Sequence, residues 1–162
     1  MNTLQNDRDR IVEQFADTVW CVALSRTGRE DAAREVFQDV FLHFFEKERT
    51  FENDEHRKAW LIRTTLICSK KYLSAFFRNT TVSLEEIEGY TADEAEPSGE
   101  VYKALLQLPA KYRVPIILYY LEEIPTDDCL QILNLKPAAF RKRLSRGREL
   151  LKKLLKGEDY CV

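Results

Sequence analysis

The sequence has few of the residues that tight turns require. Glycine and proline occur five times each among 162 residues, which is too few for the many turns of an all-β protein. Hydrophobic residues make up 44% and charged residues 32% of the chain, a balance typical of globular, strongly helical proteins. The composition therefore predicts an all-α protein with one domain or two small ones.

Signatures of metal binding, secretion and membrane insertion are also missing. The four cysteines are widely spaced without a C-x-x-C pair, so we expect reduced thiols at Cys21, Cys68, Cys129 and Cys161. The first ten residues lack the apolar core of a signal peptide, and no apolar run approaches the roughly 20 residues of a membrane span. We expect a soluble, cytoplasmic protein with no metal ion, no cofactor and no direct membrane insertion.

Catalytic constellations are absent as well. The two histidines, His43 and His56, are isolated, and the sequence has no nucleophile–base pair and no phosphate-binding glycine loop. We therefore expect neither an enzyme nor a small-molecule substrate.

Charge is distributed unevenly along the chain. The formal net charge is only −2, yet every charged residue between positions 79 and 100 is acidic. From Lys136 to Lys156 the reverse holds, because nine residues are basic and Glu149 is the only acid. Such asymmetry predicts an acidic tether beside a basic docking surface.

The spacing of apolar residues predicts two helical domains. Helices are expected over 7–25, 30–48 and 55–77, the third with Ile62, Ile67 and Leu73 on its apolar side, and they should pack as a small bundle. We place this domain at 1–78, a flexible acidic linker at 79–99 and a second helical domain at 100–162. Pro115 falls within a helical pattern, so we expect a kink or a boundary there.

Residues 126–148 read as a helix, a tight turn and a second, basic helix. Thr126 or Asp127 can cap the first helix, Asn134 suits the turn, and Pro137 suits the first turn of the second helix. The second helix should bury Phe140, Leu144 and Leu151, which leaves these polar side chains outward: Arg141, Lys142, Ser145, Arg146 and Arg148. A helix-turn-helix with a cationic second helix is typical of major-groove DNA binding.

A basic amphipathic helix can also be no more than a solvated face. Solvated helices usually intersperse both signs, because opposite charges at i,i+4 stabilise them. A single-sign stripe repels itself until phosphates neutralise it, so the pattern favours nucleic-acid binding.

Five motifs carry a family resemblance: FQDVFL at 37–42, FENDEHRKAWLIR at 51–63, LPAKYR at 108–113, LYYLE at 118–122 and RKRLSRGR at 141–148. In this order and spacing they resemble the extracytoplasmic-function (ECF) sigma factors of bacterial RNA polymerase. The resemblance implies a region 2-like domain, which docks on polymerase and melts the −10 element, and a region 4-like domain, which reads the −35 element. The chain departs from the family pattern at Asn134 and Glu123, where glycine is common, and at Ile67 and Lys71.

The resemblance also assigns roles to residues. Polymerase binding falls to one helix, at Glu35, Gln38, Asp39 and Leu42. Contact with the −10 element falls to Phe51, Asn53, Arg57, Lys58, Trp60 and Arg63, although Trp60 and Phe51 also fit a purely structural role in the core. Contact with the −35 element falls to Lys136, Arg141, Lys142, Ser145, Arg146 and Arg148.

The sequence thus indicates a sigma factor that binds core RNA polymerase and promoter DNA, with an anti-sigma factor as an open further partner. The alternative is a helix-turn-helix regulator that acts as a dimer without polymerase. A dimer would need an apolar helix beyond the basic one, and the leucines between 150 and 155 offer only a short one.

Overall fold

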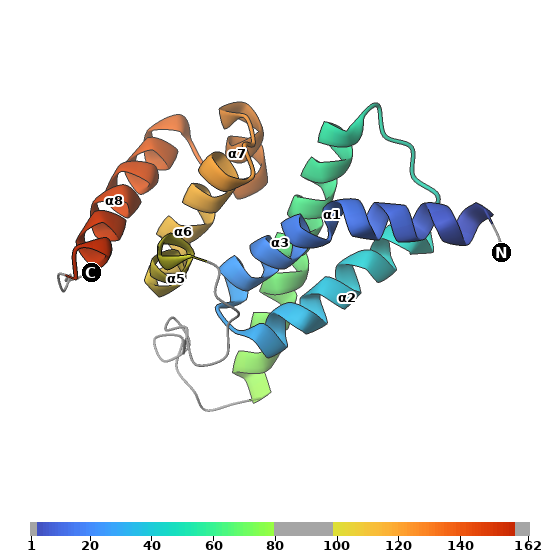
Figure 1. Cartoon of the computed structure of the whole chain (residues 1–162), viewed down its shortest axis with the longest axis horizontal. Helices are drawn as coiled ribbons and strands as arrows, with labels where there is room; N and C mark the ends of the chain where they lie inside the picture. The colour runs from blue at the N-terminus through green and yellow to red at the C-terminus, as the bar shows by residue number, and fades with distance from the viewer. Residues whose placement is uncertain (1–2, 80–98, 158–162) are drawn as a thin grey trace. The chain divides into compact units, whose positions relative to one another are not determined.

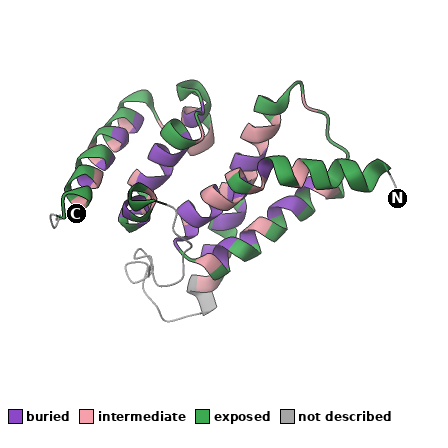
Figure 2. Ribbon diagram, in the orientation of Figure 1, coloured by how far each residue is buried: buried purple, intermediate pink, exposed green. Residues whose placement is uncertain are grey.

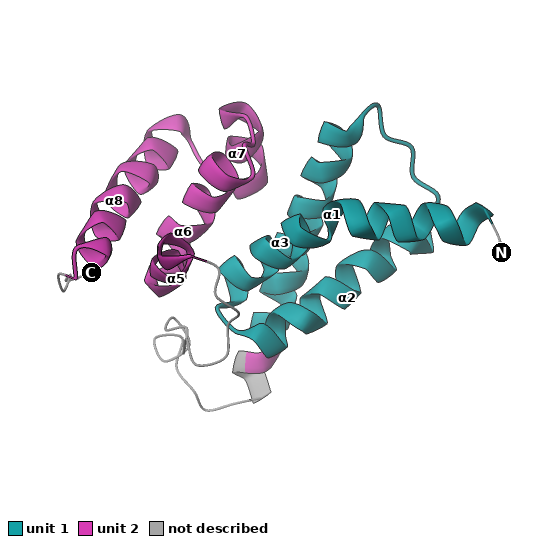
Figure 3. Cartoon of the chain, in the orientation of Figure 1, with its two compact units in different colours: residues 1–73 teal, residues 74–162 magenta. Residues whose placement is uncertain are grey.

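The computed structural model describes residues 3–79 and 99–157, and within these two ranges all regular structure is helical. The chain divides into two compact units, unit 1 at residues 1–73 and unit 2 at residues 74–162 (Figure 3). The predicted all-α class is confirmed for the described part. The segment predicted as an acidic linker, residues 79–99, lies outside the described residues apart from its two ends.

Unit 1 is built on three long helices, α1 (Thr3–Thr27), α2 (Glu30–Glu46) and α3 (Asp54–Asn79) (Figure 1). They begin and end within a few residues of the predicted bounds. Their apolar stripes are buried, as Figure 2 shows, and the core includes Phe15, Val19, Val22, Val36, Val40, Phe44, Leu61 and Ile62. Each fully buried side chain of this size contributes roughly 1.5–3 kcal/mol, so this shared core is the main source of stability within unit 1.

The predicted apolar side of α3 is partly wrong. Ile67 is exposed, whereas Thr65 and Ser69 are fully buried. Their hydroxyls donate to carbonyl oxygens one turn earlier in the same helix, Thr65 to Leu61 at 2.6 Å and Ser69 to Thr65 at 2.7 Å. With its hydroxyl satisfied in this way, a small polar side chain can be buried at little cost, and helix packing rather than hydropathy decides which face turns inward.

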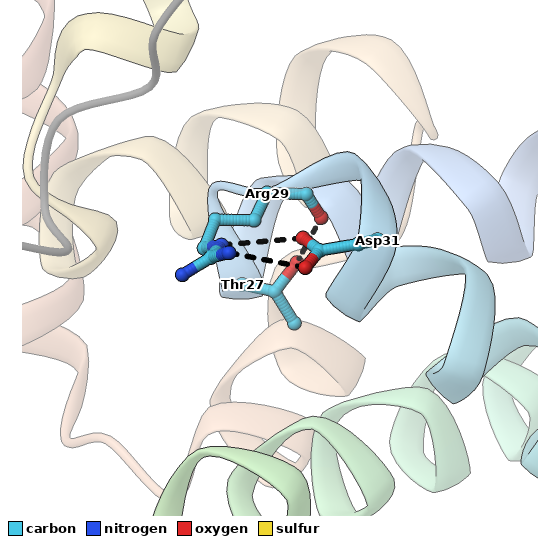
Figure 4. Close-up of polar contacts among 3 residues, drawn as sticks. All are labelled: Thr27, Arg29 and Asp31. Atoms are coloured by element: carbon cyan, nitrogen blue, oxygen red, sulfur yellow. Dashed lines mark hydrogen bonds and ion pairs between the residues drawn. The ribbon is translucent and has the colours of Figure 1, made fainter. Parts of the chain in front are cut away.

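Polar contacts hold the turn between α1 and α2 (Figure 4). Gly28 has φ 69, a conformation that glycine adopts without a steric penalty, and its N–H donates to the last turn of α1. The Arg29 guanidinium donates from Nε and Nη2 to the two carboxylate oxygens of Asp31, at 3.2 and 3.0 Å. The Thr27 hydroxyl donates to the carbonyl of Ala23 at 2.8 Å and lies 3.2 Å from the carbonyl of Arg29. The turn therefore ties the end of α1 to the start of α2.

The described part of unit 2 consists of α5 (Glu100–Gln107), α6 (Ala110–Ile116), the π-helix η2 (Ile117–Leu121), α7 (Thr126–Leu133) and α8 (Pro137–Leu155) (Figure 1). Helix α8 packs on α5 and α6. Gly147 allows the close approach, since a Cβ there would come within 2.6 Å of Ile116 Cδ1 and 3.3 Å of Tyr112 Cβ. The core is apolar and includes Leu105, Leu106, Leu108, Ile117, Leu118, Phe140 and Leu150.

Arg113 is a buried cation within this core. Arg113 is only 2% exposed. Its Nη1 donates to the carbonyl oxygens of Leu106 at 2.9 Å and Leu108 at 3.0 Å. These carbonyls end α5, where the helix leaves acceptors without intrahelical partners and a cation is favoured. The LPAKYR motif therefore has a structural purpose, which is to close α5 against α6.

Pro115 lies in the last turn of α6, and the helix widens directly after it. Proline has no N–H and its ring crowds the carbonyl four residues earlier, so the α-helical pattern is disturbed. The N–H of Glu122 donates to the carbonyl of Ile117, five residues earlier, at 2.9 Å. The chain then turns through Glu123 at φ 53, a left-handed conformation that costs a non-glycine residue free energy.

The helix-turn-helix forms as predicted, with two corrections. Asn134 has φ 53 and ψ 50 in the turn, and Pro137 is the first residue of α8. Thr126 and Asp127 do not cap α7, because Pro125 occupies the cap position and no side chain bonds the free amides. The buried side of α8 continues from Leu144 through Gly147 and Leu150, whereas Leu151 is half-buried, since a straight helix turns about 100° per residue.

Candidate nucleic-acid interface

The outer side of α8 is a cationic surface in two adjacent rows. Arg141, Ser145 and Arg148 are spaced by four and three residues, so they share one face, and all three are exposed. Lys142, also exposed, and the half-buried Arg146 form the neighbouring row. Lys136 is exposed at the cap position before Pro137. The structure therefore gathers the six residues predicted to meet the −35 element along one helix.

Two of these cations have partners within the chain. Arg148 donates from Nη1 to the phenolic oxygen of Tyr120 at 2.5 Å, and Arg146 pairs with Glu149 at 3.2 Å. Arg141 and Lys142 have no hydrogen bond or ion pair to other residues in the described ranges. This surface thus combines cations that are held in place with cations that are free to reach a ligand.

In unit 1, aromatic rings gather where α2 leads into α3. The ring of Phe44 lies 6.0 Å from that of Phe51 and 5.6 Å from that of Trp60, and Phe51 lies 6.2 Å from Trp60. Two guanidinium groups cover the cluster, Arg49 at 4.5 Å from the Trp60 ring and Arg57 at 5.5 Å from the Phe51 ring. Rings flanked by cations can hold unpaired nucleic-acid bases.

The remaining residues predicted to meet the −10 element lie around this cluster or further along α3. The side-chain oxygen of Asn53 accepts from the His56 N–H at 2.9 Å, so it caps the start of α3. Arg57 pairs with Asp54 at 2.5 Å, while its Nε is buried without a hydrogen-bond partner among the described residues. Lys58 is half-buried and Arg63 is exposed. The structure brings together the residues at 51, 53, 57 and 60, and Arg63 lies beyond them on α3.

The residues predicted to bind polymerase form one face of α2. Glu35, Gln38, Asp39 and Leu42 follow the three- and four-residue spacing of a helix face, and all four are exposed. Leu42 is 62% exposed, so it adds an apolar side chain to this polar face. Burial raises the pKa of the Cys68 thiol on α3, and the negative charge of Asp39 raises it further.

Two family models match the chain, sigma-70 region 2 over residues 11–74 and sigma-70 region 4 over residues 98–151. The chain belongs to the sigma-70 family. Among curated relatives, the ECF RNA polymerase sigma factor SigW of Bacillus subtilis is 28% identical over 90% of this chain and 87% of its own length. The chain is thus an ECF sigma factor, a DNA-binding transcription regulator that directs RNA polymerase to specific promoters.

Solved structures share the fold of this sigma factor. The sigma factor RpoE, in complex with the anti-sigma factor NepR from Bartonella quintana, matches with a TM-score of 0.71 at 22% identity, covering 93% of this chain and 97% of its own. CnrH, in complex with the cytosolic domain of CnrY, matches with a TM-score of 0.62 at 21% identity, covering 96% and 91%. These likenesses support the all-α, two-unit architecture, and the family favours a sigma factor over the dimeric regulator.

Sequence reasoning misses three residues of this sigma factor. Arg49 falls in a predicted loop, although it covers Trp60, and no motif singles it out. Tyr120 bonds Arg148 from 28 positions away, and no local pattern indicates such a pair. Arg113 belongs to a family motif that assigns it no role. The described residues contain no group of three potential metal ligands and no helix long and apolar enough to cross a membrane.

Proposed function

We propose that the two units divide promoter recognition between them. Residues 1–78 dock on core RNA polymerase and hold the melted −10 element, residues 79–99 tether the two parts, and residues 100–162 read the −35 element. The protein acts by binding rather than by catalysis, and it does so in the cytoplasm with the polymerase. The observation that carries the proposal is the outer side of α8, where exposed cations face outward and one acid, Glu149, is already paired.

Recognition of the −35 element is assigned to the first turns of α8. In a helix-turn-helix, residues near the start of the second helix reach the base edges in the major groove. Arg141 is exposed there without an intrachain partner in the described ranges, so its guanidinium is free to make a bidentate contact to guanine. Lys136, Lys142, Ser145, Arg146 and Arg148 surround it and suit contacts to phosphates or neighbouring bases.

Recognition of the −10 element is assigned to the aromatic cluster of unit 1. Stacking of a base on an aromatic ring contributes about 1–3 kcal/mol. Phe51 is half-buried and already stacks on Phe44, with interplanar angle 2°, so its outer edge and the guanidinium of Arg57 would line the pocket of a flipped base. Trp60 packs edge-on against Phe44 and Phe51, and Asn53, Lys58 and Arg63 would supply polar contacts to the strand. Supporting this assignment, cations cover both Phe51 and Trp60.

Docking on polymerase is assigned to the exposed face of α2. Truncating a contact at the centre of an interface often costs about 2 kcal/mol or more. We expect Asp39→Arg to weaken binding to core enzyme by that amount, measured by fluorescence-detected competition, while the circular-dichroism melt stays nearly unchanged because Asp39 is exposed. Asp17→Arg makes the same charge change on the exposed side of α1 and serves as the control. If wild type and Asp39→Arg bind core enzyme with equal affinity, the assignment of polymerase docking to this face is wrong.

The proposal includes an anti-sigma factor as a further partner of the protein. The sigma factor RpoE was solved in complex with the anti-sigma factor NepR, and CnrH was solved in complex with the cytosolic domain of CnrY. A free sigma factor that exposes a cationic helix and a polymerase-docking face benefits from a protein that covers them until initiation is needed. Co-purification of the chain with a tightly bound small protein would support this part of the proposal.

The decisive experiment is run-off transcription on genomic fragments. Core RNA polymerase alone, the chain alone and the two together are compared on the same templates. We expect discrete transcripts only from the combination, and gel filtration should show the chain eluting with core enzyme. A stable homodimer that binds a promoter without polymerase would favour the alternative regulator instead.

A further inference from the structure

A hydrogen bond between Tyr120 of η2 and Arg148 joins η2 to the cationic surface of α8. The phenolic oxygen of Tyr120 lies 2.5 Å from Arg148 Nη1, although the two residues are 28 positions apart in the chain. Tyr120 is 44% exposed and Arg148 is exposed, so the hydrogen bond lies at the surface, beside the face that carries Arg141 and Ser145. Holding an exposed arginine in one geometry costs side-chain entropy. A hydrogen bond that does so therefore suggests that the geometry of Arg148 matters for binding.

The backbone around Tyr120 is arranged to bring this ring to α8. Ile117 and Leu118 are buried, whereas Tyr119 and Tyr120, the next two residues of the π-helix, are exposed. The Tyr119 ring packs edge-on against Phe140 of α8 at 6.1 Å and against Tyr120 at 4.8 Å. Phe140 is a core residue of α8, so these rings fix η2 against the start of the recognition helix. π-helical turns of this kind are frequent at functional sites.

Both side chains of this pair keep hydrogen-bond donors that a ligand can use. The phenolic oxygen accepts one N–H of Arg148, so its own proton remains available to another acceptor. Arg148 keeps its four other N–H groups, which form a planar fork suited to phosphate. A tyrosine hydroxyl and an arginine fork held side by side therefore offer two kinds of donor to one anionic group.

We propose that Tyr120 is a positioning residue for Arg148, and that the two side chains together bind one backbone phosphate of the −35 element. The inference rests on the proposed function, because it takes α8 as the DNA-reading helix. Arg148 follows Arg141 by seven residues, about 10 Å along the helix, so it lies past the residues that reach base edges. Phosphate contacts of this kind fix the register of a helix in the groove and carry no base preference.

The test measures binding of holoenzyme to a fluorescein-labelled promoter duplex selected by run-off transcription. Tyr120→Phe removes only the hydroxyl, and Arg148→Met removes the charge while keeping a long side chain. Tyr119→Phe is the matched control, since it removes the neighbouring hydroxyl, for which the structure gives no hydrogen bond within the described ranges. Each variant is measured at several salt concentrations and on a panel of −35 sequences.

We expect Tyr120→Phe to weaken binding about fivefold, the effect of one lost hydrogen bond, equally on every sequence and with an unchanged salt slope. Arg148→Met should weaken binding more and lower the salt slope by about one unit, because one fewer phosphate is neutralised. In the Arg148→Met background, Tyr120→Phe should weaken binding clearly less than in the wild type, because only the tyrosine's own bond to the phosphate is then lost. Tyr119→Phe should bind as the wild type does.

The outcomes separate the inference from the proposed function. If Arg148→Met weakens binding but Tyr120→Phe does not, the positioning role is overturned and the DNA-reading helix stands. An equal Tyr120→Phe effect with and without Arg148 would also overturn it, since the tyrosine would then act alone. If neither variant alters binding or salt slope, Arg148 does not contact DNA, and that part of the proposed function is overturned with the inference.

Discussion

The two units present their cations in different ways. In unit 1, Arg49 and Arg57 lie over the rings of Trp60 and Phe51, and Arg57 is also paired with Asp54. In unit 2, Arg141 and Lys142 stand on the outside of α8 without partners among the described residues. One set of cations is part of a packed cluster, whereas the other is attached to a helix whose stability comes from its opposite side.

This difference determines how binding and stability are linked in each unit. A ring that stacks on other rings contributes to the core, so a change that alters base binding in unit 1 also alters stability. A cation on the outer side of α8 contributes little to stability, because the buried side of that helix is apolar and separate. We therefore expect base binding and stability to be coupled at the aromatic cluster of unit 1, and DNA binding and stability to be separable on α8 of unit 2.

The largest effect on stability is expected at Arg113, which, unlike the exposed cations of α8, is a buried cation of unit 2. Arg113→Ala leaves the carbonyls of Leu106 and Leu108 buried without this donor and empties the space of a large side chain. Leaving a buried acceptor unsatisfied costs about 1–3 kcal/mol, and here two carbonyls lose their donor together. Both tryptophans belong to unit 1, so a circular-dichroism melt should shift while the tryptophan fluorescence transition stays in place.

Lys111→Ala is the control for Arg113, since it removes an exposed cation two residues away and should change stability by less than about 0.5 kcal/mol. A fluorescence transition that shifts together with the circular-dichroism transition in Arg113→Ala would show that the two units unfold as one, and the comparison between them would fail.

The next effect is expected at Trp60, where unit 1 should show the coupling most clearly. Trp60→Ala removes ring contacts to Phe44 and Phe51 and uncovers Arg49, which should cost about 2 kcal/mol for a half-buried aromatic residue. Urea unfolding followed by the fluorescence of Trp20 measures this loss. Trp60→Phe should recover most of it. If Trp60→Ala unfolds at the wild-type urea concentration, the cluster is not part of the core.

A smaller effect, with no loss of stability, is expected on α8. Arg141→Ala should relax preference at one or two positions of the −35 element, where a bidentate arginine–guanine contact discriminates by about 1–3 kcal/mol. Lys152→Ala should weaken binding evenly across sequences and reduce the salt dependence. A promoter-variant transcription panel at two salt concentrations distinguishes them. Unchanged base preference in Arg141→Ala would leave α8 as a non-specific phosphate clamp.

Much of unit 2 follows from local chemistry and is predictable. Asn134 in the turn and Pro137 at the start of α8 occupy positions that backbone sterics assign to them. Phe140 and Leu144 mark the buried side through their spacing alone. The same spacing predicts Leu151 to be buried with them, but Gly147 and Leu150 are buried instead. The sequence pattern does not show that α6 approaches closely enough to require a glycine.

What could not be predicted depends on contacts between distant residues. Thr65 and Ser69 are buried because their side of α3 packs inward. Hydropathy counts these residues as polar, although their hydroxyls are satisfied within the helix. The pairing of Tyr120 with Arg148 requires the π-helix after Pro115, and the exposure of Ile67 requires knowing which face of α3 packs inward. In each case the tertiary arrangement, and not the local propensity, decides where the side chain lies.

The smallest effect is expected at the turn of unit 1, where Asp31 pairs with Arg29 (Figure 4). Burial raises the pKa of Asp31, but hydrogen bonds from Arg29 and the Ala32 N–H outweigh it and hold the pKa below its ordinary value of 3.8. A lowered pKa in the folded state stabilises the protein above pH 3.8 and ceases to do so as the pH falls through the folded value. Because the pair is exposed, Asp31→Asn should cost no more than about 0.5 kcal/mol at about pH 7, and the difference from wild type should shrink by about pH 3. Urea unfolding followed by tryptophan fluorescence at both pH values measures it. A difference of equal size at the lower pH would mean that the carboxylate charge is not what stabilises this turn.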